Sequence, residues 1–263
     1  MTPFVILGRF FLEFIQDTGG VFLLMWRTCQ TLPRTFANAR STLQQMDRIG
    51  IGSIPLVLVT SLFVGAVTSV QAAYQFHGYV PLQYLGTVVG KSVTLELGPV
   101  LTALVVGGRV SASIAAELGT MKVTEQIDAM EMIAIDPVEY LVLPRVVAST
   151  IMLPVLTIFS DFLAILGGMV VANISLHVSF NTFESGLKLL FRTQDLVGGL
   201  MKTFVFGFII ALMGCYHGFE TRGGAEGVGI ATMKAVVTSC LLILVSNYLL
   251  ASIIFRIIFA PAS

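Results

Sequence analysis

Five long runs of apolar residues set the strongest limit on what this chain can fold into. They cover approximately residues 54–73, 92–116, 146–174, 197–216 and 235–258. Each run has the length that a helix needs to cross the hydrocarbon core of a membrane, about 20 residues for about 30 Å. Because no water is present there, the backbone must satisfy its own hydrogen bonds within the segment. The sequence therefore predicts an all-α integral membrane protein with five transmembrane helices.

The charge content agrees with this prediction and excludes several functions. Only 11% of the 263 residues are charged, whereas soluble domains have about 25%. The formal net charge is zero, so we expect no nucleic-acid partner. The sequence contains no GxSxG, HExxH or Walker-type phosphate loop, and its three histidines are far apart. We therefore expect a chain that is not an enzyme and holds no metal or nucleotide of its own.

The first fifty residues have a different pattern. Arg9, Glu13 and Asp17 are spaced by four and form one thin polar stripe on an otherwise apolar helix. Such a helix suits the membrane interface, where it lies in the plane of the bilayer, although ordinary packing against the bundle gives the same pattern. We divide the chain into an N-terminal interfacial or elbow region, residues 1–50, and a five-span domain, residues 51–263.

The distribution of lysine and arginine predicts an orientation. With a cytosolic N-terminus, ten basic residues fall on the inner side and five on the outer side. The outer five are Lys91, Lys188, Arg192, Lys202 and Arg256. The prediction is a cytosolic N-terminus and cytosolic connections over residues 109–145 and 217–234. The second of these holds a glycine-rich stretch, residues 223–229, that we interpret as a flexible turn.

Two carboxylates lie inside apolar runs. Glu96 is followed closely by Gly98 and Pro99, so the helix is expected to bend and free backbone carbonyl groups there. A charge in a span is costly and needs a cavity, a partner or the interface. Glu96 is thus either a polar point in a substrate cavity or gate, or a carboxylate bonded to a neighbouring span. For Asp161 in the third run, a structural role and a polar path are equally compatible with the sequence.

Residues 123–134 have helical periodicity. Val123, Ile127, Met130 and Ala134 share one face, and Thr124 is placed to cap the start. Asp136 and Pro137 are expected to end this helix. The segment is either a solvated loop helix or a docking helix whose apolar ridge enters a groove on a cytosolic partner. Glycine pairs at GxxxG spacing, Gly86/Gly90 and Gly214/Gly218, favour close helix contacts inside the membrane.

One long stretch strongly resembles a known family. The residues ELGPVLTALVVGGRVSASIAAELGTMKVTEQIDAMEMIAIDPVEYLVLPRV, from Glu96 onward, are similar to the MlaE/YrbE permeases, and the likeness extends loosely over residues 50–255. These permeases are the membrane subunits of ABC transporters that work with MCE-domain proteins on phospholipids. The resemblance implies an N-terminal interfacial helix, five spans and a cytosolic coupling helix between the second and third spans. It also implies the bacterial inner membrane and maintenance of outer-membrane lipid asymmetry.

The same resemblance implies partners and site residues. The implied partners are a second copy of the chain, a cytosolic ABC ATPase that binds ATP and Mg²⁺, and a periplasmic MCE protein. A small cytosolic accessory subunit is a further partner that the resemblance allows. The positions that match the substrate cavity are Thr68, Gln75, Phe76, Tyr79, Glu96 and Leu97. The positions that match the ATPase-coupling element are Glu117, Thr120, Lys122, Glu125, Ile127, Asp128 and Met130.

The chain departs from its relatives in the cavity. Some relatives have a basic residue beside the cavity glutamate, where this sequence has Leu95, and Thr68 and Gln75 stand at positions that can be aliphatic. Two other functions compete with an ABC permease. A self-sufficient secondary transporter would show inverted repeats and an ion pathway, which are not visible in the sequence. A membrane scaffold without a transport path would bind an ATPase but no lipid.

Overall fold

The computed structural model describes residues 3–33, 38–76, 80–190 and 192–258. All regular secondary structure in these ranges is helical. The α-helices are α1 (Pro3–Thr31), α2 (Ala39–Gly50), α3 (Ile54–Phe76), α4 (Leu85–Ser92), α5 (Gly98–Val123), α6 (Gln126–Met132), α7 (Leu143–Leu176), α8 (Phe180–Leu190), α9 (Thr193–Phe219) and α10 (Gly224–Ile258). Short 3₁₀ turns, η2 (Ile51–Ser53) and η3 (Leu82–Tyr84), and π-helical turns, η4 (Val93–Leu97) and η5 (Val138–Val142), join some of them.

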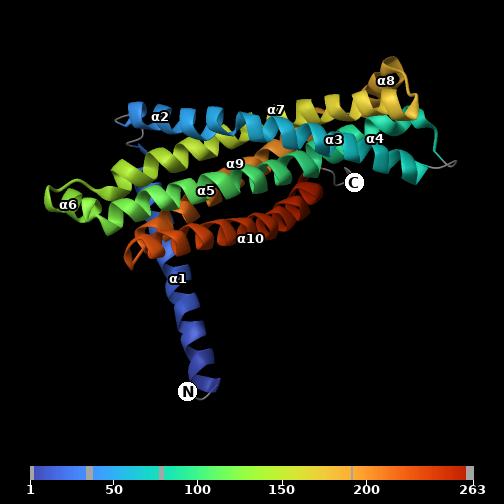
Figure 1. Ribbon diagram of the computed structural model, residues 1–263. Coiled ribbons are helices and arrows are strands. Elements are labelled where there is room, and N and C mark those ends of the chain that lie inside the picture. Colours follow the sequence, from blue (N-terminus) through green and yellow to red (C-terminus); the bar gives the residue numbers. More distant parts are fainter. Residues whose placement is uncertain (1–2, 34–37, 77–79, 191, 259–263) are drawn as a thin grey trace.

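Five rods, each long and apolar enough to cross a membrane, confirm the predicted number of spans in the described part of the chain. They run over Ala39–Phe76, Leu82–Val123, Val138–Leu176, Thr193–Phe219 and Gly224–Arg256. The second rod has 42 residues, which is about 63 Å of helix and twice the thickness of the hydrocarbon core. The rods therefore extend past the predicted spans, and their ends carry the polar residues. Figure 1 shows them side by side, with α6 at one end and α8 at the other.

Glycines bring the rods into backbone contact. A Cβ atom on Gly65 of α3 would lie 1.7 Å from the carbonyl oxygen of Ala164 in α7, and one on Gly167 would lie 2.4 Å from that of Leu62. The two predicted GxxxG pairs behave in the same way. Gly86 meets the backbone of Phe183 in α8, and Gly218 meets Leu118 in α5. The predicted close helix contacts are confirmed, because only a hydrogen atom fits at these positions.

Helix α1 projects crosswise from the bundle at the α6 end (Figure 1). Its attachment includes Tyr216 of α9, whose hydroxyl donates a hydrogen bond to Asp17 at 3.0 Å and whose ring lies against Gly20. Leu24, one turn further on, is buried in the main core. The side chains of Arg9 and Glu13 lie outside the described residues, so the predicted polar stripe is visible only at Asp17. The helix itself is longer than the stripe and continues to Thr31.

The glycine-rich stretch differs from its prediction. Only its first residues form the turn, where Gly223 and Gly224 have φ angles of +91° and +70°. From Gly224 the chain is already helical, and Gly227 and Gly229 lie inside α10. A Cβ atom on Gly227 would lie 1.9 Å from the carbonyl oxygen of Arg222, so this glycine lets the new helix begin tightly against the turn.

Candidate functional sites at the two ends of the bundle

The turn between α5 and α6 begins later than predicted. Helix α5 continues to Val123, and the Thr124 hydroxyl donates back to the Thr120 carbonyl at 2.8 Å instead of capping a new helix. Such back-bonding satisfies the hydroxyl inside its own helix. Glu125 then reverses the chain with a left-handed φ of 59°, and α6 runs from Gln126 to Met132. The predicted cap at Thr124 is therefore wrong.

Asp136 and Pro137, which were predicted to end this helix, lie beyond its end. Helix α6 ends at Met132, before a turn in which Ala134 has a φ of 60°. The Asp136 carboxylate accepts a hydrogen bond from the Val138 backbone N–H at 2.9 Å, so it caps the start of η5. Asp136 and Pro137 thus begin the third rod and do not end α6.

Helix α6 turns its apolar ridge inward. Ile127 is only 4% exposed and belongs to the main hydrophobic core, and Met130 packs against that core. Met132 and Ile133, at the end of the helix, are 88% and 69% exposed. An ion pair of 2.6 Å between Lys122 and Asp128 fastens α6 to α5. In this conformation Ile127 anchors α6 to the chain itself, and the most exposed large apolar residues around α6 are Met132 and Ile133.

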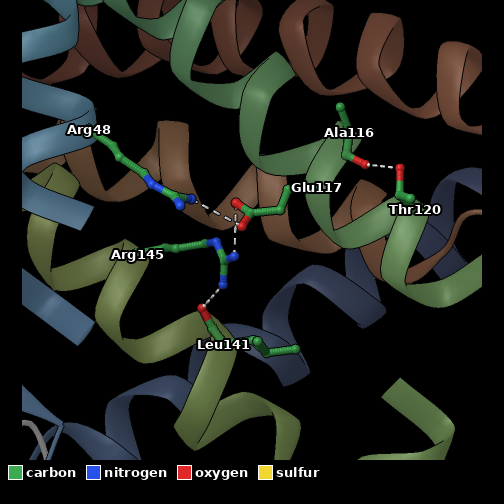
Figure 2. A network of polar contacts seen from close by, with 6 residues as sticks. All are labelled: Arg48, Ala116, Glu117, Thr120, Leu141 and Arg145. Atoms are coloured by element: carbon green, nitrogen blue, oxygen red, sulfur yellow. Dashed lines mark hydrogen bonds and ion pairs between the residues drawn. The ribbon is translucent and has the colours of Figure 1, made fainter. Parts of the chain in front are cut away.

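Near this turn, Glu117, Arg145 and Arg48 form a polar cluster that ties three rods together (Figure 2). We call it the inner cluster, after the predicted orientation. Glu117 of α5 accepts from Arg145 of α7 at 3.0 Å and from Arg48 of α2 at 3.2 Å. Arg145 is 4% exposed and also donates to the Leu141 carbonyl at 2.6 Å. The nearby Thr120 hydroxyl bonds only the Ala116 carbonyl of its own helix, at 2.7 Å. Glu117, predicted as a coupling residue, is therefore fully engaged inside the chain.

At the opposite end of the second rod, the predicted bend is confirmed as the π-helical turn η4. In a regular helix the Leu95 carbonyl would accept from the backbone nitrogen of residue 99, but this residue is Pro99, which has no N–H. The ammonium group of Lys202, from α9, donates to the Leu95 carbonyl at 3.1 Å. The same nitrogen lies 2.6 Å from Glu96 Oε1, and the Asn247 amide of α10 donates to Glu96 Oε2 at 3.1 Å.

We call Glu96, Lys202 and Asn247 the outer cluster, after the predicted orientation. It confirms that Glu96 is bonded to neighbouring spans, and it leaves a substrate role for Glu96 as a prediction. The carboxylate is bonded to two neighbouring spans, yet its side chain is still 38% exposed, whereas Lys202 is 2% exposed. Glu96 and Glu117 are 21 residues apart in one rod, or about 31 Å. This separation is similar to the thickness of the hydrocarbon core.

The other predicted cavity residues do not contact this cluster. Leu97 turns the other way, into an apolar cavity of about 350 Å³ between α3, α5 and α7, which Phe63 and Ser160 also line. On α3, the Thr68 hydroxyl bonds the Val64 carbonyl at 2.7 Å, Gln75 is exposed, and Phe76 packs on the smaller core with Leu85 and Val89. Tyr79 lies outside the described residues.

Sequence reasoning missed Lys202, Asn247 and Arg48. Lys202 was counted among the outer connections although it lies within the fourth apolar run, and Arg145 was counted on the inner side although it is buried in an ion pair. The available signal was simple: an ionisable residue inside an apolar run needs a partner of opposite charge. If both residues are left out, each side of the orientation count loses one basic residue, and the inner side still has the excess.

Comparison with known proteins identifies the family. The model of the family described as "Permease MlaE" matches residues 42–253, which include both polar clusters. A probable ABC transporter permease protein of Synechocystis is 44% identical over 219 residues, 83% of each chain. One from Rickettsia typhi is 39% identical over 252 residues, 96% of this chain and 97% of its own. The chloroplastic protein TRIGALACTOSYLDIACYLGLYCEROL 1 of Arabidopsis thaliana is 37% identical over 82% of this chain and 62% of its own. With a match over this length and relatives at these identities, the chain belongs to the MlaE permease family.

Proposed function

We propose that this chain is the transmembrane subunit of an ABC transporter that moves phospholipids between the bacterial inner membrane and a periplasmic MCE-domain protein. The observation that carries the proposal is the outer cluster, a charged and half-exposed carboxylate set into an otherwise apolar bundle. A phospholipid needs an apolar wall for its acyl chains and a few fixed polar groups for its head group. Glu96, Lys202 and Asn247 supply the polar groups. The cavity beside Leu97 opens on another face of the second rod, so the apolar wall next to the cluster comes from exposed residues of α10 such as Leu244. The Arabidopsis relative is named after a galactolipid, which agrees with a lipid substrate for this chain.

The proposed orientation places α6 and the N-terminus in the cytosol. The basic bias of the inner side supports it, and Arg48 and Arg109 both lie on that side. Helix α1 then lies along the inner surface of the membrane, because it crosses the bundle at the α6 end (Figure 1). In this arrangement two copies of the chain enclose the lipid path, with the MCE protein on the periplasmic side. The transporter maintains the lipid asymmetry of the outer membrane.

Energy comes from a separate cytosolic ATPase that binds ATP and Mg²⁺. The proposed contact is the far end of α6, where Met132 and Ile133 form an exposed apolar pair close to the predicted coupling residues. Lys122 joins α6 to α5, and Glu117 joins α5 to α2 and α7. A displacement of α6 by the ATPase is therefore transmitted to the second rod, which also contains Glu96. The proposed assembly also includes a small cytosolic accessory subunit.

The docking surface is tested by a double substitution, Met132→Asp with Ile133→Asp. In the proposed complex, both side chains make apolar contacts with the ATPase. Replacing them by charges is expected to lower co-purification with the ATPase at least about tenfold, while the chain stays folded because both residues are exposed in it. Gln44→Asp, an exposed change on α2 at the same end, serves as the matched control and should bind normally. Normal binding by the double variant would show that the ATPase docks elsewhere.

The function is tested with the purified chain in proteoliposomes, together with its ATPase and the MCE protein. We expect ATP-dependent transfer of fluorescent phospholipid to the MCE protein and lipid in the purified assembly by mass spectrometry. Transfer by the chain alone, without nucleotide, would identify a self-sufficient transporter. Binding of the ATPase without bound lipid or transfer would identify a scaffold.

A further inference from the structure

Asp161 is a buried carboxyl group that neither polar cluster uses. It lies on α7, is 4% exposed, and its Oδ1 atom has no hydrogen-bond partner. Across the part of the chain that the structure describes, no hydrogen bond or ion pair reaches this side chain. A carboxylate left in this state inside a membrane bundle would have a high free-energy cost, whereas the neutral acid avoids most of that cost.

The charged residues of the neighbouring helices are already paired or distant. Helix α3 contains no charged residue. Lys202 of α9 bonds Glu96 and the Leu95 carbonyl, Lys91 of α4 pairs with Asp195, and Lys188 of α8 pairs with Glu184. On α5 the nearest cation is Arg109, eleven residues and about 16 Å beyond Gly98, and the charges of α2 lie at the same inner end. Among the residues that the structure describes, no cation therefore stands ready to neutralise Asp161.

The carboxyl group does have a neighbour of the right kind. A Cβ atom on Gly98 would lie 1.7 Å from Asp161 Oδ1 and 3.0 Å from the carbonyl oxygen of Val93. The carboxyl oxygen and the carbonyl oxygen thus border the same small space, which glycine leaves open. Two oxygen atoms attract each other at such a site only when one of them carries a hydrogen atom. The Val93 carbonyl closes the π-turn by accepting from the Gly98 backbone N–H, and its second lone pair is available for another donor.

We propose that Asp161 carries its proton and donates a hydrogen bond to the Val93 carbonyl, and so acts as a positioning residue for the π-turn that presents Glu96. The chemical state of Asp161 stands independently of the transported substrate. Its importance for transport rests on the function proposed above. In this role the third rod holds the bend of the second rod from one side, while Lys202 of the fourth rod holds it from the other.

The chemical state is tested by infrared difference spectroscopy of the full-length chain in lipid nanodiscs at neutral pH. Wild type minus Asp161→Asn is expected to show the C=O stretch of a protonated carboxylic acid, with the downshift in D₂O that such a group gives. Glu96→Gln is the matched control, and its difference spectrum should show carboxylate bands because Glu96 is ion-paired. Carboxylate bands in the Asp161→Asn difference spectrum would overturn the proposal.

The positioning role is tested in the assembled transporter. Asp161→Asn keeps a donor of the same shape and should transfer lipid within about twofold of wild type. Asp161→Leu removes the donor and should slow transfer about tenfold, with unchanged ATPase binding. Wild-type transfer by the Leu variant would disprove the positioning role. If wild type itself moves no phospholipid, the proposed function fails, while the infrared result still decides the state of Asp161.

Discussion

Replacement of Lys202 by methionine is expected to destabilise the chain strongly. The ammonium group is 2% exposed and serves two acceptors, Glu96 Oε1 and the Leu95 carbonyl. Pro99 cannot supply the missing N–H, so the carbonyl is left without its donor. Removal of one partner of a buried ion pair costs about 3–5 kcal/mol. Because Glu96 keeps 38% of its side-chain surface exposed, we expect about 3 kcal/mol, the lower end of that range.

The measurement is the free energy of unfolding of the purified chain in detergent, followed through helical circular dichroism. Methionine keeps the length and the apolar stem of the lysine side chain, so the change reports the charge and the hydrogen bonds. Lys188→Met on α8 is the matched control, since its ion pair with Glu184 is exposed and its loss should leave the free energy of unfolding nearly unchanged. Equal losses in the two variants would show that Lys202 is not a buried partner of Glu96.

A second substitution separates stability from transport. Glu96→Gln combined with Lys202→Met removes both charges and should recover most of the lost stability, because no charge is then left unpaired. Lipid transfer should stay low in this double variant, since the polar groups proposed for the head group are gone. Recovery of transfer together with stability would restrict the outer cluster to a structural role and would remove the main support for a lipid site at Glu96.

The outer cluster also shows how far the sequence was informative. The bend at Glu96 was predictable because Gly98 and Pro99 act on the local backbone, and the five spans were predictable because hydrophobicity is summed over each segment. The partner of Glu96 was not predictable. Lys202 lies 106 residues away, and the pairing depends on which faces of α5 and α9 meet. Periodicity identifies a face of a helix, but it does not identify the neighbour.

Helix α6 illustrates the same difference on a smaller scale. Its amphipathic pattern was recognised, and the two roles that the pattern allows were left open. In the structure Ile127 packs into the chain's own core, and the exposed apolar pair follows at Met132 and Ile133. The start of the helix was misplaced because Thr124 has two acceptable hydrogen-bonding states. In the structure the hydroxyl bonds back to Thr120, and the chain reverses one residue later, at Glu125.

Glu117 tests whether the inner cluster holds the bundle together or contacts the ATPase. Glu117→Ala leaves Arg145, which is 4% exposed, with only the Leu141 carbonyl as a partner. We expect the free energy of unfolding to fall by about 3 kcal/mol, since an uncompensated buried cation remains while water reaches the site through the 39% exposed glutamate position. Arg48→Ala is the matched control within the same cluster. Arg48 is 66% exposed, so its loss should cost no more than about 1 kcal/mol.

The two roles of Glu117 predict different pairs of measurements. If Glu117 joins α2, α5 and α7, the alanine variant loses stability, and Glu117→Ala with Arg145→Leu recovers most of it because the buried charge is also gone. ATPase binding, measured below the unfolding temperature, then stays near normal. If Glu117 instead contacts the ATPase directly, binding falls while stability holds, and Arg145→Leu gives no recovery. The geometry favours the first outcome, because each carboxylate oxygen already accepts from an arginine of this chain. The ATPase would then act on the inner cluster through α6 and its ion pair with Lys122.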